Sequence, residues 1–360
     1  MSTPTPSPLQ RMVASTATDL WNDSCSIKDL RYSIEHGAVG ATSNPTIVFG
    51  VMQQEFGDWK DRVAQLFVER STSTDAEITW QLIEEMAVKA AALLRPVFER
   101  TAGKKGWLSL QTNPEYYKSA DLLVQQAVRF SELAPNIQVK LPATEAGIQA
   151  IEEVTALGVN INATVSFTVP QAIAVAEAVE RGLSRRTAAG ESIAHAVPVC
   201  TIMVGRLDDW LKVCAEKQGL VPTPGTLDWA GVACVKRAYG LYKKAGYRTR
   251  LLAAAYRNHL HWSELIGGDL ILTIPTAWQR RFNASSVEVK PRMDDAIPEQ
   301  ALAELTEQFP DFRRAYDPRG LEIREFDGYG ATVRTLRAFL TSYYDLLGFV
   351  RDRRLPNPDV

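Results

Sequence analysis

Apolar residues along this chain follow two alternating patterns. Short apolar or alternating runs are separated by longer stretches in which apolar residues return every three or four positions. The short runs are typical of strands and the longer stretches of amphipathic helices, so their alternation predicts βα units around a parallel sheet. The expected strands are Thr18–Asp23, Val39–Asn44, Trp107–Gln111, Ile137–Leu141, Val159–Phe167, Val199–Arg206, Arg250–Arg257 and Leu270–Pro275. Eight such strands predict an α/β fold, the (β/α)8 TIM barrel.

The longer stretches predict the helices around this barrel. They are Glu77–Phe98, Ser119–Leu133, Glu145–Leu157, Pro170–Arg181, Trp229–Ala245 and Gly330–Val350. No linker interrupts the series, so residues 1–360 are expected to form a single TIM-barrel domain. Within it we expect a flexible N-terminus over residues 1–15 and a C-terminal helical extension over residues 276–360, whose last helix packs on the barrel.

Composition narrows the possible partners and cofactors. The net charge of −2 is spread without a basic stripe, which argues against nucleic acid. No secretory signal or apolar run of about 18 residues is present, and the four cysteines lack a CxxC spacing, so we expect a cytoplasmic protein with free thiols and no membrane contact. His259 and His261 lack an evident third ligand, so no metal is expected. We expect a monomer or a homodimer.

One strand carries a lysine on the face that should point into the barrel. Side chains alternate between the two faces of a strand, so Ile137, Val139 and Leu141 should meet the surrounding helices. Gln138 and Lys140 then point to the barrel axis. A lysine is an unusual residue for that interior, and it therefore becomes the first candidate for a functional group.

Other polar side chains gather near it by the same alternation. They are Asp23 (on the face of Trp21), Thr42 with Asn44, Ser109 with Gln111, and Asn162 with Thr164 and Ser166. They lie toward the carboxyl ends of the strands, where the sites of such barrels are found. Each one alone could be a satisfied structural group, but together they favour a polar site.

A buried lysine suits carbonyl chemistry. A Schiff base needs the neutral amine, and lowering the lysine pKa from near 10.4 by about three units corresponds to roughly 4 kcal/mol, within reach of desolvation. Lys140 could equally be paired with a carboxylate for structural reasons. Asp23 is placed to act as general acid/base, and Asn44 and Asn162 could bind substrate hydroxyls. Arg206 and Arg257 lie at strand ends and could bind a phosphate. Either could instead form a surface ion pair.

Two motifs resemble signatures of the transaldolase family. They are Val39-Gly-Ala-Thr-Ser-Asn-Pro-Thr-Ile47 and Val139-Lys-Leu-Pro-Ala-Thr-Glu-Ala-Gly-Ile148, the second around that family's Schiff-base lysine. Weaker similarity extends over most of residues 18 to 275. The resemblance implies transfer of a dihydroxyacetone unit between sugar phosphates, without cofactor or metal. It also implies these roles: Lys140 as nucleophile, Asp23 as acid/base, Asn44 and Asn162 as substrate ligands, Thr164 as a water ligand, and Arg206 and Arg257 as phosphate ligands.

Several positions differ from the transaldolase pattern. Gln111 stands where a glutamate orients the catalytic water, Thr201 and Met203 replace a serine and a phenylalanine, and Ala255 replaces a serine near the second phosphate arginine. By these positions Gln111 is expected to be catalytic, and Thr201 and Met203 are expected to bind substrate. An insertion also lengthens the chain around Leu183–His195. Gln111 is similar to the glutamine of fructose-6-phosphate aldolase, which cleaves rather than transfers, although that enzyme has a tyrosine at the position of Met203.

Four hypotheses follow from the sequence. The first is a transaldolase; the second is a fructose-6-phosphate-aldolase-like lyase or a transaldolase of shifted sugar specificity. A third is a non-catalytic sugar-phosphate-binding descendant, which the retained lysine and aspartate argue against. A metal-dependent aldolase is the fourth, and it lacks a ligand set.

Overall fold

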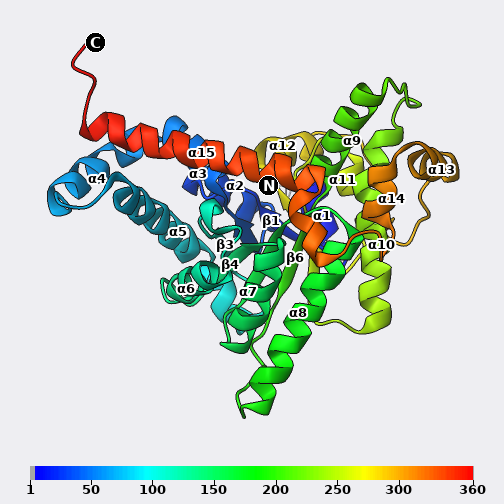
Figure 1. The fold of residues 1–360 in the computed structure, drawn as a ribbon, viewed down its shortest axis with the longest axis horizontal. Coiled ribbons are helices and arrows are strands. Elements are labelled where there is room, and N and C mark those ends of the chain that lie inside the picture. The colour runs from blue at the N-terminus through cyan, green and yellow to red at the C-terminus, as the bar shows by residue number, and fades with distance from the viewer. Residues whose placement is uncertain (1–4, 360) are drawn as a thin grey trace.

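Eight parallel strands close into a barrel in chain order, as the computed structural model of residues 5–359 shows (Figure 1). The strands are β1 Asp19–Asn22, β2 Gly40–Thr42, β3 Trp107–Gln111, β4 Ile137–Pro142, β5 Ile161–Ser166, β6 Val199–Met203, β7 Arg250–Ala254 and β8 Ile271–Ile274. The first and last strands pair in parallel, which closes the sheet. The predicted TIM-barrel fold is therefore confirmed.

Helices surround this barrel and follow most of its strands. The α-helices are α1 Pro8–Ser15, α2 Ile27–Glu35, α3 Pro45–Gln54, α4 Phe56–Glu69, α5 Asp75–Arg100, α6 Ala120–Ser131, α7 Glu145–Ala156, α8 Val169–Ala188, α9 Val204–Gln218, α10 Ala230–Ala245, α11 Leu260–Ser263, α12 Thr276–Asn283, α13 Glu299–Gln308, α14 Pro310–Tyr316 and α15 Gly330–Arg354. Short 3₁₀ helices are η1 Pro114–Tyr116, η2 Thr226–Trp229 and η3 Ile323–Gly328. The first residues of the expected insertion, 183–188, belong to α8.

The N-terminal segment is more ordered than its composition predicted. Residues 8–15 form α1, in which the Ser7 side chain and Gln10 make a reciprocal cap at the helix start. Leu9 and Met12 are fully buried, and the Trp262 indole N–H lies 3.2 Å from the Met12 sulfur. Residues 8–15 of the segment expected to be flexible thus form a helix, and one apolar face of this helix docks on the barrel. Residues 1–4 lie outside the described part of the chain.

A small apolar cluster fills the barrel interior toward the amino ends of the strands. Its members come from five strands and are separate from the main core: Trp21, Trp107, Val199, Leu252, Ala254 and Ile271. Gly40 makes room for it, since a Cβ there would lie 2.3 Å from the Trp21 ring. Apolar side chains therefore occupy the interior at this end, and functional sites of such barrels lie at the other end.

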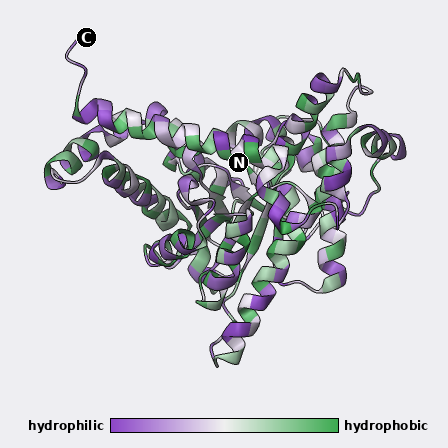
Figure 2. Ribbon diagram, in the orientation of Figure 1, coloured by the Kyte–Doolittle hydropathy of each residue, from purple (hydrophilic) through white to green (hydrophobic). Residues whose placement is uncertain are grey.

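The C-terminal helix α15 crosses the carboxyl end of the barrel (Figure 1). It contacts α3, α5 and α9 on the outer ring and β5 within the sheet. Hydrophobic and hydrophilic residues alternate along it (Figure 2), and its apolar side buries Phe339 and Tyr343. The predicted packing of this helix on the barrel is confirmed, and it places side chains from the end of the chain over the polar interior.

Candidate active site

Lys140 is the central polar residue of the barrel interior. In register it lies between Gln111 of β3 and Asn162 of β5. Its side chain is buried, with a relative exposure of 2% for the residue. Burial lowers the pKa of the Lys140 amine to about 8, although the nearby charge of Asp23 acts in the opposite direction. A useful fraction of the amine is therefore neutral, and able to attack a carbonyl, near neutral pH.

Asp23 follows directly after β1 and is held by a pair of threonines. The Thr42 hydroxyl donates to Asp23 Oδ1 at 2.7 Å, so the Thr273 hydroxyl, 2.7 Å from Thr42 Oγ1, must donate to Thr42. Burial raises the pKa of the Asp23 carboxyl, while the charge of Lys140 and the Thr42 hydrogen bond lower it. The carboxyl is therefore fixed in direction and able both to take and to return a proton.

The pKa of Lys140 predicts a pH dependence for imine formation. Because only the neutral amine attacks a carbonyl, the rate should rise about tenfold per unit below pH 8 and level off above it. Initial rates of borohydride trapping with a saturating carbonyl compound, measured from pH 6 to pH 9, test this. A rate that is flat across the range would contradict an amine that titrates near 8.

A chain of hydrogen bonds crosses the barrel beneath the lysine. Thr201 donates to Asn162 Oδ1 at 2.7 Å, and Asn162 Nδ2 donates to Ser109 Oγ at 3.0 Å. Ser109 in turn donates to Gln138 Oε1 at 2.9 Å, and the Gln138 amide donates to the backbone oxygen of Val197. Asn162 is thus oriented by both neighbours and keeps one amide hydrogen for a ligand. Thr201, expected to bind substrate, contacts Asn162.

Three further predicted residues differ in how fully they are bonded. Asn44 caps α3, since its Oδ1 accepts from the Ile47 backbone N–H at 3.0 Å, which leaves its amide hydrogens for a ligand. Thr164 is fully buried, with its hydroxyl 4.0 Å from the Met203 sulfur. Gln111 Oε1 is buried without a hydrogen-bond partner. A buried orphan acceptor is uncommon in proteins, and here it suits a water or substrate hydroxyl.

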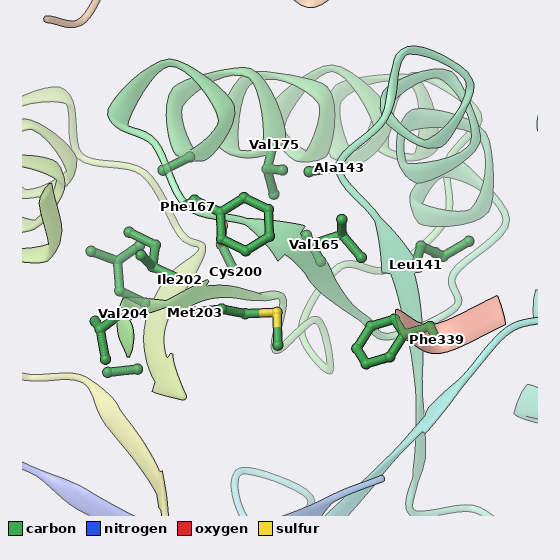
Figure 3. Packing of buried hydrophobic residues seen from close by; sticks show 14 of the residues in the cluster. Leu141, Ala143, Val165, Phe167, Val175, Cys200, Ile202, Met203, Val204 and Phe339 are labelled. Atoms are coloured by element: carbon green, nitrogen blue, oxygen red, sulfur yellow. The ribbon is translucent and has the colours of Figure 1, made fainter. Parts of the chain in front are cut away.

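Met203 and Phe339 form an apolar wall over these polar groups. In Figure 3 the Met203 sulfur is directed to the side on which Phe339 of α15 lies, away from Phe167 and α8. Met203 is 5% exposed and Phe339 is fully buried. Because Phe339 comes from the distant C-terminal helix, no local sequence pattern around the barrel strands identified it.

The two predicted phosphate arginines lie beyond the strand ends rather than on the strands. Arg206 belongs to the first turn of α9, its Nε has no hydrogen-bond partner, and its guanidinium lies 5.3 Å from the Phe339 ring centroid. Arg257 lies in the loop after β7 and forms an ion pair with Asp209 at 2.8 Å. Burial lowers the pKa of Arg206, and the charge of Arg257 lowers it further. Two cations that repel each other at a partly buried place favour an anion between them.

Three more residues at this place were not found from the sequence. Asp209 binds the Arg257 side chain, and its backbone oxygen accepts from Arg334 of α15 at 3.0 Å. Tyr256 is buried and its hydroxyl has no partner. Asp209 alone carried a sequence signal, because it lies one turn from Arg206 on the same helix.

Three other features bear on the sequence expectations. All four cysteines are free and buried, as predicted. Within residues 5–359, no group of three or more His, Cys, Asp or Glu is placed to hold a metal ion. No helix in this described range is long and apolar enough to cross a membrane.

The fold and site together define a (β/α)8 barrel with an internal lysine and carboxyl pair at the carboxyl ends of its strands. Comparison with known families agrees, since residues 20–317 match the family model described as "Transaldolase/Fructose-6-phosphate aldolase". The chain belongs to the transaldolase/fructose-6-phosphate aldolase family.

Curated relatives cover most of the chain. A protein named transaldolase from Thiobacillus denitrificans is 30% identical over 369 aligned residues, which span 93% of this chain and 97% of that protein. "Transaldolase 1" of Streptomyces avermitilis is 29% identical over 66% of this chain and 68% of its own length. A transaldolase of Neisseria meningitidis is 29% identical over 71% of this chain and 76% of its own.

Proposed function

We propose that the chain is a transaldolase that forms a Schiff base at Lys140 and transfers a dihydroxyacetone unit from a ketose phosphate to an aldose phosphate. The observation that carries this proposal is the buried Lys140 amine, with its pKa lowered to about 8, in the electrostatic field of Asp23. The family and the names of the relatives support the same activity. Other members of the site fit the steps that this chemistry requires.

The first half of the reaction breaks a carbon–carbon bond. Neutral Lys140 Nζ adds to the ketose carbonyl, and loss of water gives an iminium, with protons supplied and removed by Asp23. Asp23 then takes the proton of the hydroxyl on the second carbon beyond the iminium carbon. The bond between that carbon and the carbon next to the iminium breaks, and an aldose phosphate leaves. The positive iminium nitrogen draws in the electrons of that bond, which remain on the enzyme in a neutral enamine.

The second half reverses these steps with a different aldehyde. The enamine carbon attacks the acceptor carbonyl, and Asp23 returns its proton to the new alkoxide. Water then adds to the iminium and releases the product from Lys140. In this scheme Asn44 and Asn162 offer amide hydrogens to the hydroxyls of the bound unit, and Gln111 Oε1 with Thr164 Oγ1 holds the water.

The phosphate of either sugar suits the cations at the mouth of the barrel. Arg206 has an unused Nε, and Arg257 keeps N–H groups on Nη1 and Nη2 beyond those bound to Asp209 and the Tyr256 backbone oxygen. Guanidinium groups pair with phosphate oxygens through two parallel hydrogen bonds. We therefore assign sugar phosphates as the substrates and these arginines as the phosphate ligands.

A coupled assay tests the activity directly. Purified enzyme is incubated with fructose 6-phosphate, with and without erythrose 4-phosphate, and both free dihydroxyacetone and the transfer product are quantified. Transfer that depends on the acceptor supports a transaldolase. Release of dihydroxyacetone at the same rate without acceptor would favour the second candidate, a fructose-6-phosphate-aldolase-like lyase. Gln111 is the residue that favours this candidate.

Gln111 should control the fate of the three-carbon unit. A glutamine can bind a water but cannot take its proton, whereas a glutamate can do both. We expect Gln111→Glu to change the ratio of transfer to release by about tenfold, while Schiff-base trapping persists. The ratio measured in the coupled assay is the test. An unchanged ratio would show that Gln111 does not hold the hydrolytic water.

The setting of the enzyme follows from its thiols and substrates. Four free, buried cysteines support a reducing compartment, and we assign the cytoplasm. We expect a monomer or a homodimer, which light scattering of the purified protein will distinguish.

A further inference from the structure

Behind Arg257 lies a buried acid and histidine that the proposed chemistry does not use. Asp208 belongs to α9 and His261 to α11, and both are 0% exposed. His261 Nε2 lies 2.7 Å from Asp208 Oδ2. A buried carboxylate and imidazole in contact are costly to bring together unless their remaining polar atoms are bonded, so these bonds need to be traced.

The other ring nitrogen shows which tautomer is present. His261 Nδ1 lies 3.1 Å from the backbone nitrogen of Arg257, which can only donate a hydrogen bond. Nδ1 is therefore the acceptor, and Nε2 carries the hydrogen that it donates to Asp208. The neutral ring thus links a carboxylate on one helix to the main chain of a predicted phosphate ligand.

The carboxylate also holds the neighbouring helix. Asp208 Oδ1 accepts from the backbone N–H of Gly231, near the start of α10, at 2.9 Å. Gly231 has no space for a side chain, since a Cβ there would lie 2.4 Å from the Val204 backbone oxygen. Asp208 therefore joins α9, α10 and α11 at the point where they meet the carboxyl end of the barrel.

The loop that carries Arg257 is also packed directly on the helix that carries Arg206. Ala255 has a φ of +68°, which turns the chain at the end of β7, and its carbonyl accepts from the Gly205 N–H at 3.1 Å. A Cβ on Gly205 would lie 2.6 Å from Arg257 Cγ and 3.2 Å from His261 Cε1. A non-glycine residue at positive φ is strained, and such strain persists where the surroundings hold it.

Two consecutive aspartates thus hold Arg257 in different ways. Asp209 binds its guanidinium, whereas Asp208 holds its backbone N–H through His261. We propose that Asp208 and His261 are a positioning pair that fixes Arg257 relative to Arg206 and so makes the enzyme prefer phosphorylated substrates. This inference rests on the proposed function in one respect, the phosphate carried by the substrate.

The pair is tested by two substitutions at one position. His261→Phe keeps a similar ring volume and removes both hydrogen bonds, whereas His261→Gln keeps one acceptor and one donor. We expect His261→Phe to raise KM for fructose 6-phosphate about tenfold with little change in kcat, and to leave KM for fructose unchanged. His261→Gln should bring KM for fructose 6-phosphate most of the way back to the wild-type value. Loss of packing alone would affect both donors alike.

A binding measurement separates this inference from the proposed activity. Calorimetric titration of the whole protein with inorganic phosphate should give about tenfold weaker binding for His261→Phe than for the wild type. If the wild type neither transfers nor forms an adduct, the proposed function fails, and the phosphate titration still decides on the pair. Equal phosphate affinities, or equal changes in KM for both donors, would overturn the positioning role. If His261→Phe does not fold, Asp208→Asn takes its place, with the same expected direction and the same contradicting results.

Discussion

Lys140→Met should abolish covalent trapping and lower turnover by at least about 10⁴-fold, as removal of a covalent nucleophile does in other enzymes. Methionine has a similar length and no amine, so the variant fills the same buried space between Gln111 and Asn162. Borohydride with fructose 6-phosphate should label the wild-type chain on the peptide that contains Lys140. Mass spectrometry of the intact variant should show no such adduct.

A second lysine provides the control. Lys118 is exposed in the segment after η1, outside the barrel interior. Lys118→Met should be trapped and should turn over like the wild type. Activity retained in Lys140→Met, or an adduct on another lysine at the wild-type rate, would rule out the Schiff base at this residue.

Asp23→Asn should lower kcat by about 10²- to 10⁴-fold while covalent trapping continues. Asparagine keeps the shape and can still accept from Thr42, but it cannot exchange a proton with substrate. The change also removes the charge that holds up the pKa of Lys140, so the neutral amine should be available at lower pH. The pH dependence of trapping should therefore shift to lower pH in this variant.

Asp19 supplies a matched control on the same strand. It lies at the start of β1, where it binds Lys105 and Arg250 near the amino ends of the strands. Asp19→Asn should leave kcat and the pH dependence of trapping unchanged. Equal losses of kcat in the two variants would show that Asp23 acts through the stability of the strand and not through proton transfer.

The strand alternation predicted the barrel and the position of Lys140, because apolar and polar faces differ clearly along β4. It was wrong for Ser166, which was expected inside the barrel with Asn162. Val165 has a φ of +52°, and the pairing of β5 with β6 shifts register between Ala163 and Ser166. Ser166 consequently lies beside the thiol of Cys200, which belongs to the outer core. Alternation cannot anticipate a backbone irregularity of this kind.

Residues that act from a distance were also beyond the reach of sequence patterns. The apolar stripe of α15 predicted that this helix is docked, but a stripe does not say which residue of the barrel it meets. Only the tertiary structure shows that Phe339 packs against Arg206. The same holds for the hydrogen bond that Arg334 donates to the Asp209 backbone oxygen. The Ser/Thr/Pro composition near the start of the chain likewise did not predict the capped helix that residues 8–15 form.

The packed amino end of the barrel has a consequence for the order of events. Because Trp21 and Trp107 lie in the interior at that end, we expect a sugar to reach Lys140 from the carboxyl side, where α15 lies. In the proposed mechanism donor and acceptor then share one entrance, so the first aldose phosphate has to leave before the second can approach the enamine. The kinetics should accordingly be ping-pong, with the two aldose phosphates competing with each other for the enamine form of the enzyme.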